Sequence, residues 1–518
     1  MNPRDIRPLH TERTRMTRKK LASLAISLLV VASITTIFVR GFFEPPRPSR
    51  VHRLGGNVRP ERDNSPAANT GVDRNVQITD GEPREAKVIS VGSLVSYESE
   101  NSESDQGWSR FRGPNGTGVS SETSIPTSWS DSRHLIWKTK IPGPGSSSPV
   151  LSDSSVFLTS YTGYGDEDSS GGHLEDLKRH LHRIDRKSGE IVWTRSVEAL
   201  LPEDRYSGMG IPEHGYATNS PVTDGSNVYA FLGKSGVFAY DAQGSELWHA
   251  NVGNESGNRG WGTASSLILY KNLVIVNASE ENQALFALHK DSGEVVWKAP
   301  ASILELAYGT PVIARVDEQR DDLVLAVPGE VWGLNPNTGK LVWFATTTLT
   351  GNLSPSVISD GDKVYVFGGY RSSGSLAIQM GGVGDVTKSH ILWTSRNSSY
   401  VVTPILSQNH LVWIDDQGMY FCIDAKSGEL IEKKRVPDIE SRGRKVYASP
   451  VAIGGKLYMQ TRHSGVFVLS GEPGYQLISQ NRFESDDSVF NATPAVDGGR
   501  LFLRSYRNLY CVGSVVKE

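Results

Sequence analysis

From about residue 146 to the end of the chain, short runs of apolar residues alternate with turns rich in Gly, Asp and Ser. One example is Val228-Tyr229-Ala230-Phe231, which follows Asp224-Gly225; another is Leu501-Phe502-Leu503, which follows Asp497-Gly498. Alternation with a period of two is typical of β-strands, and glycine-containing turns are typical of hairpins. The pattern predicts an all-β fold of short antiparallel strands.

These strands belong to a repeat whose most visible marker is Ser/Thr-Pro followed by an apolar residue. The prolines of the marker are Pro149, Pro221, Pro311, Pro355, Pro404, Pro450 and Pro494, and the last five are separated by 44, 49, 46 and 44 residues. A further unit without proline begins at Ser265-Ser266-Leu267-Ile268, which brings the number of units to eight. Four strands in roughly 45 residues correspond to one propeller blade. We therefore expect an eight-bladed β-propeller with four-stranded antiparallel blades.

Each complete unit ends with a tight turn and a strand that carries Trp. The fullest copy runs from Ile184 to Trp193 through Ser188-Gly189, and Leu334 to Trp343 repeats it. A large apolar ring at a repeated position on an outer strand is expected to pack between neighbouring blades.

The two ends of the repeat region complete each other. The last unit stops at Gly513, before its Trp strand, whereas His134-Leu135-Ile136-Trp137-Lys138 is a Trp strand without a unit in front of it. Pairing the two would close the ring and remove exposed strand edges. We expect residues 134–140 to be the outer strand of the last blade.

The N-terminal part of the chain predicts a membrane anchor. Residues 1–20 are basic, and residues 21–39 carry no charge and are long enough to form a transmembrane helix. The basic flank predicts a cytoplasmic N-terminus and a periplasmic or otherwise extracytoplasmic propeller over 108–518. Residues 44–107 are charged and rich in Ser and Pro, so we expect a disordered tether there. A cleaved signal peptide is the alternative.

Composition excludes several kinds of site. The net charge of −3 and the scattered basic residues argue against nucleic-acid binding. Cys422 and Cys511 fall in units six and eight, too far apart for a disulfide. His180 and His182 are expected on one polar face of a strand, so we predict no metal site.

The full repeat pattern, Ser/Thr-Pro-Val, Asp-Gly, Val-Tyr-Val and Asp-x-x-Ser/Thr-Gly-Glu/Lys-x-x-Trp, resembles the pyrroloquinoline-quinone (PQQ) repeat. The chain is similar to PQQ-like propellers related to the outer-membrane assembly factor BamB. The segment Trp108-Ser109-Arg110-Phe111-Arg112-Gly113-Pro114 resembles the entry segment of such propellers in planctomycete bacteria. Many members of this superfamily bind no quinone, so function has to be argued from the site.

Two functions follow from the resemblance. The first is a binding or protein-interaction scaffold without catalysis, which holds an unidentified protein, peptide or small molecule at the propeller funnel. The alternative is a quinoprotein dehydrogenase with PQQ and Ca²⁺ in the funnel, but those enzymes characteristically carry an adjacent Cys-Cys pair that this chain lacks, so we expect no cofactor. The candidate funnel residues precede the inner strands: His214, Tyr216, Asn219, Trp261, Tyr308, Asn352, Tyr400, Tyr447 and Asn491. The alternative is that these side chains hydrogen-bond neighbouring blades and fill the channel.

Overall fold

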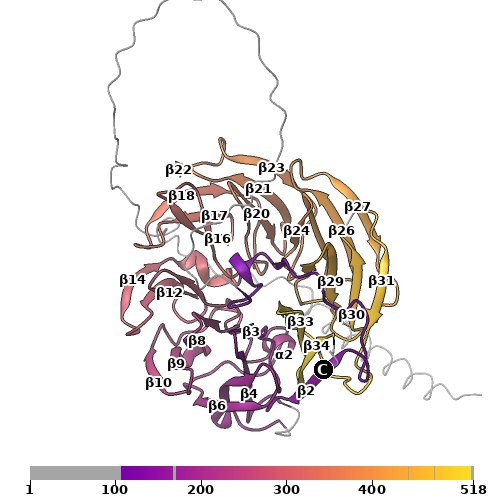
Figure 1. The fold of residues 1–518 in the computed structure, drawn as a ribbon. Coiled ribbons are helices and arrows are strands. Elements are labelled where there is room, and N and C mark those ends of the chain that lie inside the picture. The colour runs from indigo at the N-terminus through magenta and orange to yellow at the C-terminus, as the bar shows by residue number, and fades with distance from the viewer. Residues whose placement is uncertain (1–106, 167–170, 441–442, 472, 515–518) are drawn as a thin grey trace, which may run out of the picture. The chain divides into compact units, whose positions relative to one another are not determined.

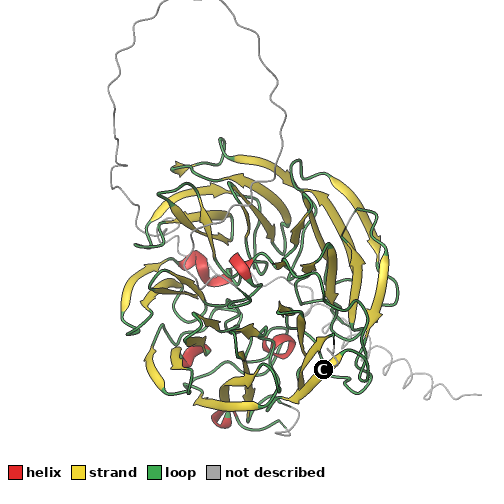
Figure 2. Ribbon diagram, in the orientation of Figure 1, coloured by secondary structure: helices red, strands yellow, loops and turns green. Residues whose placement is uncertain are grey.

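The computed structural model describes residues 107–166, 171–440, 443–471 and 473–514, which form eight β-sheets arranged as the blades of a propeller (Figures 1 and 2). The chain divides into two units, Met1–Gly56 and Asn57–Glu518, and every described residue lies in the second. The predicted anchor and nearly all of the predicted tether lie outside the described residues. Within the described part of the chain, no helix is long and apolar enough to cross a membrane.

Blade three shows how the strand pattern produces a blade. It contains β11 (Ile268–Tyr270), β12 (Leu273–Ala278), β13 (Ala284–His289) and β14 (Val295–Pro300), all antiparallel. Every residue of β12 is buried, because neighbouring blades cover both of its faces, whereas exposed residues predominate on the outer strand β14. The alternation in the sequence is therefore strongest where a strand meets solvent.

The remaining blades follow in chain order. Blade one has β3 (Val150–Leu151), β4 (Ser155–Thr162), β5 (Lys178–Asp185) and β6 (Ile191–Glu198); blade two has β7 (Val222–Thr223), β8 (Asn227–Phe231), β9 (Val237–Asp241) and β10 (Glu246–Ala250). Blade four has β15 (Val312–Arg315), β16 (Asp321–Val327), β17 (Glu330–Leu334) and β18 (Leu341–Thr346); blade five has β19 (Ile358–Asp360), β20 (Lys363–Gly368), β21 (Gly374–Gln379) and β23 (Ile391–Ser395). Blade six has β24 (Ile405–Ser407), β25 (His410–Ile414), β26 (Met419–Asp424) and β27 (Leu430–Arg435); blade seven has β28 (Val451–Ile453), β29 (Lys456–Gln460), β30 (Val466–Ser470) and β31 (Leu477–Asn481).

Short elements supplement this framework. Two short strands add in parallel to blades: β1 (Val119–Ser120) to β28, and β22 (Gly384–Asp385) to β18. The helices of the described residues are short: η2 (Pro114–Gly116), η3 (Leu174–Asp176), α2 (Ile211–His214), η4 (Gly233–Ser235) and η5 (Ser302–Leu306).

Blade eight confirms the predicted closure. Its strands are β32 (Ala495–Asp497), β33 (Arg500–Arg504), β34 (Asn508–Gly513) and, from the other end of the repeat region, β2 (Leu135–Lys140). β2 pairs antiparallel with β34 and places Trp137 opposite Cys511. The ring is therefore closed by backbone hydrogen bonds between segments more than 350 residues apart.

A closed ring of hydrogen bonds surrounds the central channel and explains the Ser/Thr marker of the repeat. In each blade, a backbone N–H donates to the hydroxyl at the same position of the next blade, with N···O distances of 2.9–3.1 Å. The eight residues are Ser148, Ser220, Ser266, Thr310, Ser356, Thr403, Ser449 and Thr493. We call them the hydroxyl ring.

The ring corrects the alignment of the repeat in blade five. The member from this blade is Ser356, not the Ser354 that precedes Pro355, so an alignment on proline is shifted there by two residues. Ser266 takes part although no proline follows it. The hydroxyl, rather than the proline, is what every blade retains, since it satisfies a buried N–H of the neighbouring blade.

The predicted packing of the repeated Trp between blades is confirmed in five blades. Each indole N–H donates to a backbone carbonyl in the turn of the next blade, over 2.8–3.2 Å: Trp137 to Arg186, Trp193 to Ala242, Trp248 to Lys290, Trp297 to Pro336 and Trp393 to Ala425. Trp343 differs, because blade five lacks the glycine turn, and its indole donates to Asp322 of its own blade over 2.7 Å. Where Glu432 replaces Trp, its carboxylate accepts the Gly474 N–H of the next blade over 3.0 Å.

The structure also bears out the other strand assignments. His180 and His182 lie on one face of β5 with ring centres 5.9 Å apart, and their imidazoles hydrogen-bond to Ser and Thr hydroxyls. Cys422 and Cys511 are both free and buried, in blades six and eight.

Candidate functional site

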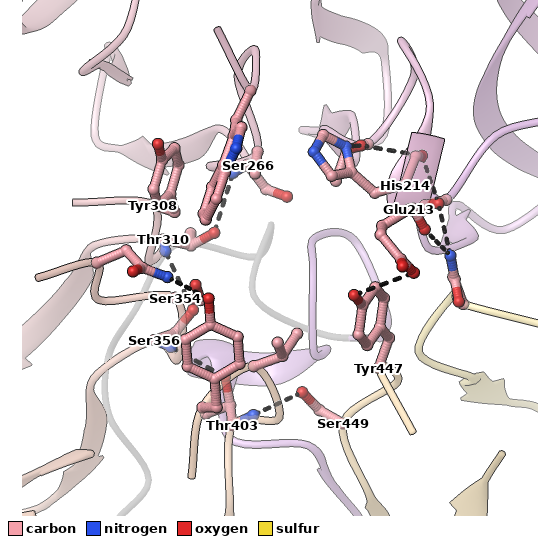
Figure 3. Close-up of a pocket in the computed structure, with 18 of the residues that line it drawn as sticks. Glu213, His214, Ser266, Tyr308, Thr310, Ser354, Ser356, Thr403, Tyr447 and Ser449 are labelled. Atoms are coloured by element: carbon pink, nitrogen blue, oxygen red, sulfur yellow. Dashed lines mark hydrogen bonds between the residues drawn. The ribbon is translucent and has the colours of Figure 1, made fainter. Parts of the chain in front are cut away.

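The central channel holds a cavity of about 240 Å³. Its walls are the loops through which each outer strand leads into the next inner strand, and all eight residues of the hydroxyl ring also line it. Figure 3 shows several of them beside the loop residues. We call this cavity the funnel and its exposed side, where Met209 and Tyr370 lie, the mouth.

Residues 108–118 extend across the middle of the ring (Figure 1, violet). The Trp108 carbonyl accepts from Leu151 of blade one, and the Gly118 carbonyl accepts from Ala452 of blade seven. The guanidinium of Arg112, fully buried, donates to the carbonyls of Thr403 and Pro404 in blade six, each over 3.0 Å. Burial without a carboxylate partner lowers the pKa of Arg112 to about 9. The entry segment thus ties together blades that are distant in sequence, and its Phe111 lines the funnel.

Seven of the nine predicted residues line the funnel: His214, Trp261, Tyr308, Asn352, Tyr400, Tyr447 and Asn491. Tyr216 and Asn219 do not, which corrects the prediction. Tyr216 is buried behind the wall, where its hydroxyl donates to the Asp204 carbonyl over 2.6 Å. Asn219 is buried between blades, with its side-chain amide donating to Thr263 and to the Ser265 carbonyl.

Sequence reasoning missed the charged residues of the funnel. Glu213, Arg259 and Arg444 all line it, as do the more exposed Met209 and Tyr370 at the mouth. Arg259 and Arg444 lie two and three residues before the predicted Trp261 and Tyr447, so a search of the same loops for charge would have found them.

Residues 199–221, the insertion between β6 and β7, cover one side of the mouth; we call them the crossing loop. The Glu213 carboxylate of this loop accepts from Arg462 over 2.7 Å. It also accepts from the Tyr447 hydroxyl over 3.3 Å (Figure 3). The Glu213 carbonyl accepts from the Asn491 amide over 2.9 Å. Nearer the start of the loop, Glu203 pairs with Arg179 over 2.5 Å in a buried cluster.

Three arginines lie over aromatic rings at the mouth. Guanidinium-to-ring distances are 4.9 Å for Arg259 on Trp261, 4.5 Å for Arg444 on Tyr400 and 4.6 Å for Arg462 on Tyr447. Such stacking holds the planar guanidinium in place while its N–H groups stay available for hydrogen bonds. Arg259 and Arg444 line the funnel and can offer N–H groups to a ligand there, whereas Arg462 is buried and paired with Glu213.

His214 does not contribute a charge. Loss of contact with water lowers its pKa to about 4, and its Nδ1 lies 2.7 Å from the Thr218 hydroxyl. The imidazole is therefore neutral at neutral pH and acts as a polar part of the wall.

The funnel offers few of the carboxylates that a Ca²⁺–quinone site uses. Among the described lining residues, the one carboxylate is Glu213, which is already bound by Arg462. Cys422 and Cys511 lie in the interior of separate blades, where burial raises their pKa values to about 11 and about 12. Throughout the described ranges, no three or more His, Cys, Asp or Glu side chains converge in a way that could hold a metal ion.

The fold and the funnel define the class of protein as an eight-bladed β-propeller with PQQ-like repeats. A family model described as outer membrane protein assembly factor BamB matches residues 127–259 and 177–434, and the chain belongs to this family.

Solved structures share the fold. The crystal structure of BamB from Moraxella catarrhalis matches with a TM-score of 0.51 at 15% identity, over 74% of this chain and 99% of that one. The quinohemoprotein alcohol dehydrogenase from Comamonas testosteroni has a TM-score of 0.38 at 12% identity, over 80% and 81% of the two chains. No curated protein matches the sequence. At 15% identity, the likeness to the Moraxella catarrhalis protein shows the fold alone.

Proposed function

We propose that the chain is a membrane-anchored scaffold that holds a partner polypeptide at the mouth of the funnel without catalysing a reaction. The observation that carries the proposal is the set of arginine-covered aromatic rings around the mouth. Arg, Tyr and Trp are the residues that most often dominate the energy of protein interfaces. The family description, which concerns protein assembly, is consistent with this role.

The rigidity of the funnel supports the same proposal. The hydroxyl ring, the strand pairing of β2 with β34 and the buried entry segment fix the loops that carry the mouth residues. A preorganised surface loses little conformational entropy when it binds, which favours affinity.

Photo-crosslinking tests the proposal. p-Benzoylphenylalanine at Tyr370, which is exposed at the mouth, should give a discrete crosslinked product in cells of the native host. The matched control is Leu430, which is also exposed but lies on the outer strand of blade six. Equal crosslinking from both positions, or none from Tyr370, would argue against binding at the mouth.

The anchoring part of the proposal rests on the uncharged segment 21–39 and its basic flank. Protease added to intact spheroplasts should cut within 44–107 and release the propeller. Protection of the propeller under these conditions would show that the proposed orientation is wrong.

A further inference from the structure

One side of the mouth already binds an acidic peptide unit, which belongs to the chain itself. The crossing loop places the Glu213 carboxylate against Arg462 and Tyr447 and the Glu213 carbonyl against the Asn491 amide. The Tyr506 hydroxyl also donates to this carbonyl over 3.3 Å. Blades seven and eight thus recognise both the side chain and the backbone of a glutamate.

The opposite side carries similar groups without such a segment. We call it the uncovered wall: the mouth loops of blades four to six, with Tyr308, Asn352, Tyr370 and Tyr400. Figure 3 shows Tyr308 across the cavity from Glu213. Among the described residues, no hydrogen bond of the crossing loop reaches blades four to six.

Two arginines flank the uncovered wall. Arg259 is exposed and forms no ion pair within the described part of the chain, while its guanidinium lies over Trp261. Arg444 is half-buried over Tyr400 and uses Nη1 for Asp416 at 3.0 Å, which leaves other N–H groups of its fork for a second acceptor. The charge at both edges of the wall is therefore suited to carboxylates.

Asn352 supplies a buried acceptor on the same wall. Its amide nitrogen donates to the Tyr400 hydroxyl over 2.8 Å, whereas its Oδ1 is buried and has no hydrogen-bond partner among the described residues. The Asn352 side chain is 1% exposed. A buried acceptor without a partner is costly, and a ligand with an N–H group would satisfy it.

We propose that the uncovered wall binds an extended acidic segment of a partner polypeptide. Arg259 and Arg444 receive its carboxylates, and Asn352 Oδ1 accepts one of its backbone N–H groups. This inference rests on the proposed function and specifies the partner's chemistry. The contact of Glu213 with Arg462 and Tyr447 is then the intramolecular equivalent of the contact between the partner segment and the uncovered wall.

Fluorescence anisotropy with the full-length chain tests the inference. The probes are fluorescein-labelled octapeptides of alternating Glu and Gly, and of alternating Lys and Gly. The acidic peptide should bind at least tenfold more tightly than the basic one, and its affinity should fall as salt rises, because exposed ion pairs are screened.

Variants locate the binding. Arg259→Gln and Arg444→Gln should each weaken binding of the acidic peptide about fivefold or more. Asn352→Leu should also weaken this binding, but without changing how the affinity depends on salt. Arg435→Gln, at an exposed arginine on the outer strand β27, should leave the affinity for the acidic peptide unchanged. Unfolding curves check that each variant is folded.

Three results would overturn the inference: equal affinity for both peptides, an equal effect of Arg435→Gln, or full competition by an acidic oligosaccharide such as oligogalacturonate with no effect of Asn352→Leu. The last would indicate a general anion site. If crosslinking from Tyr370 succeeds while the acidic peptide does not bind, the inference fails and the scaffold stands. If Tyr370 gives no crosslink, the scaffold itself fails.

Discussion

The serine or threonine that opens each repeat has a physical role that its sequence does not reveal. Its hydroxyl accepts a backbone N–H from the preceding blade, and Ser356 shows that the hydroxyl keeps this role even where the proline has moved. Such hydrogen bonds are buried, so the loss of one acceptor leaves an N–H without a partner.

Thr403→Val tests the hydroxyl ring at one residue. The valine has nearly the same shape but cannot accept from the Ser356 N–H, which lies 2.9 Å away in the native protein. We expect a loss of about 1–3 kcal/mol, seen as a lower Tm in thermal unfolding. Thr403→Ser keeps the acceptor and should lose clearly less; equal losses would show that the hydroxyl is not what matters.

The repeated turn glycine is explained by the Trp of the preceding blade. A Cβ on Gly293 would lie 2.5 Å from Cε3 of Trp248, and the backbone there has a φ of +74°. Gly225 has a comparable φ of +92°, but a Cβ there would meet nothing within 4 Å. Comparing substitutions at the two positions therefore separates the cost of backbone strain from the cost of steric crowding.

Gly293→Ala should therefore lower Tm more than Gly225→Ala. Both substitutions carry a left-handed backbone cost of about 1–2 kcal/mol, and only the first also displaces a packed indole ring. Differential scanning calorimetry of the two variants measures the difference. Equal shifts would mean that the Trp does not set the requirement for glycine.

Buried carboxyls near the crossing loop predict a pH dependence. Burial raises the pKa of Glu281 to about 8 and that of its neighbour Glu280 to about 7, with Glu203 and Arg179 close to them. The folded protein then holds protons that the unfolded chain releases above its usual pKa of about 4.3. Stability from this source should fall as pH rises from about 5 to about 8.

The variant Glu281→Gln tests this pH dependence, because a glutamine side chain cannot ionise. The fall in Tm from about pH 6 to about pH 8.5 should be smaller in this variant than in the native chain. Glu429→Gln, at an exposed turn, should keep the native dependence. An unchanged slope in Glu281→Gln would show that this carboxyl does not titrate in the folded state over that range.

At the residue scale, the sequence predicted which loops the funnel residues lie in better than which way their side chains point. Seven of nine predicted residues line the funnel because they precede inner strands, whose starts converge on the channel. Tyr216 and Asn219 obey the same rule, yet the crossing loop and the blade contacts turn them away. These contacts join residues far apart in sequence, so no local pattern could show them.

Among the elements, β2 is a strand whose partner could be predicted although the two lie far apart in the sequence. A Trp strand without a unit and a unit without a Trp strand leave one pairing that closes the ring, and β2 adopts it. The path of residues 108–118 across the channel could not be predicted, because it depends on Arg112 reaching carbonyls in blade six.

Deleting residues 134–140 tests the importance of this closing strand. Without β2, strand β34 becomes an exposed edge, so its amides should exchange with solvent faster and unfolding should lose cooperativity. Hydrogen-exchange mass spectrometry of Asn508–Gly513 is the measurement. The control is Trp137→Phe, which keeps the strand but loses the indole hydrogen bond to Arg186; similar exchange in the deletion variant and the native chain would contradict the role of β2.

At the scale of the whole molecule, the period of the repeat predicted the number of blades, and the missing last strand predicted how the ring of blades closes. The same regularity says little about function, because identical blades can surround different sites. What distinguishes this funnel is the charge and stacking of residues in its loops, such as Arg259 on Trp261, together with a carboxylate that is already paired.

The central functional claim is that this propeller binds a partner and does not oxidise substrates. The most direct test is to incubate the full-length chain with PQQ and Ca²⁺ and to follow dye reduction with alcohols and aldoses, beside the same mixture without protein. A quinone site needs a metal and a carboxylate base, and Glu213 is the carboxylate that the described funnel offers. We predict no turnover above the protein-free mixture. Turnover that disappears on chelation and in Glu213→Gln would contradict the account and establish a quinoprotein dehydrogenase.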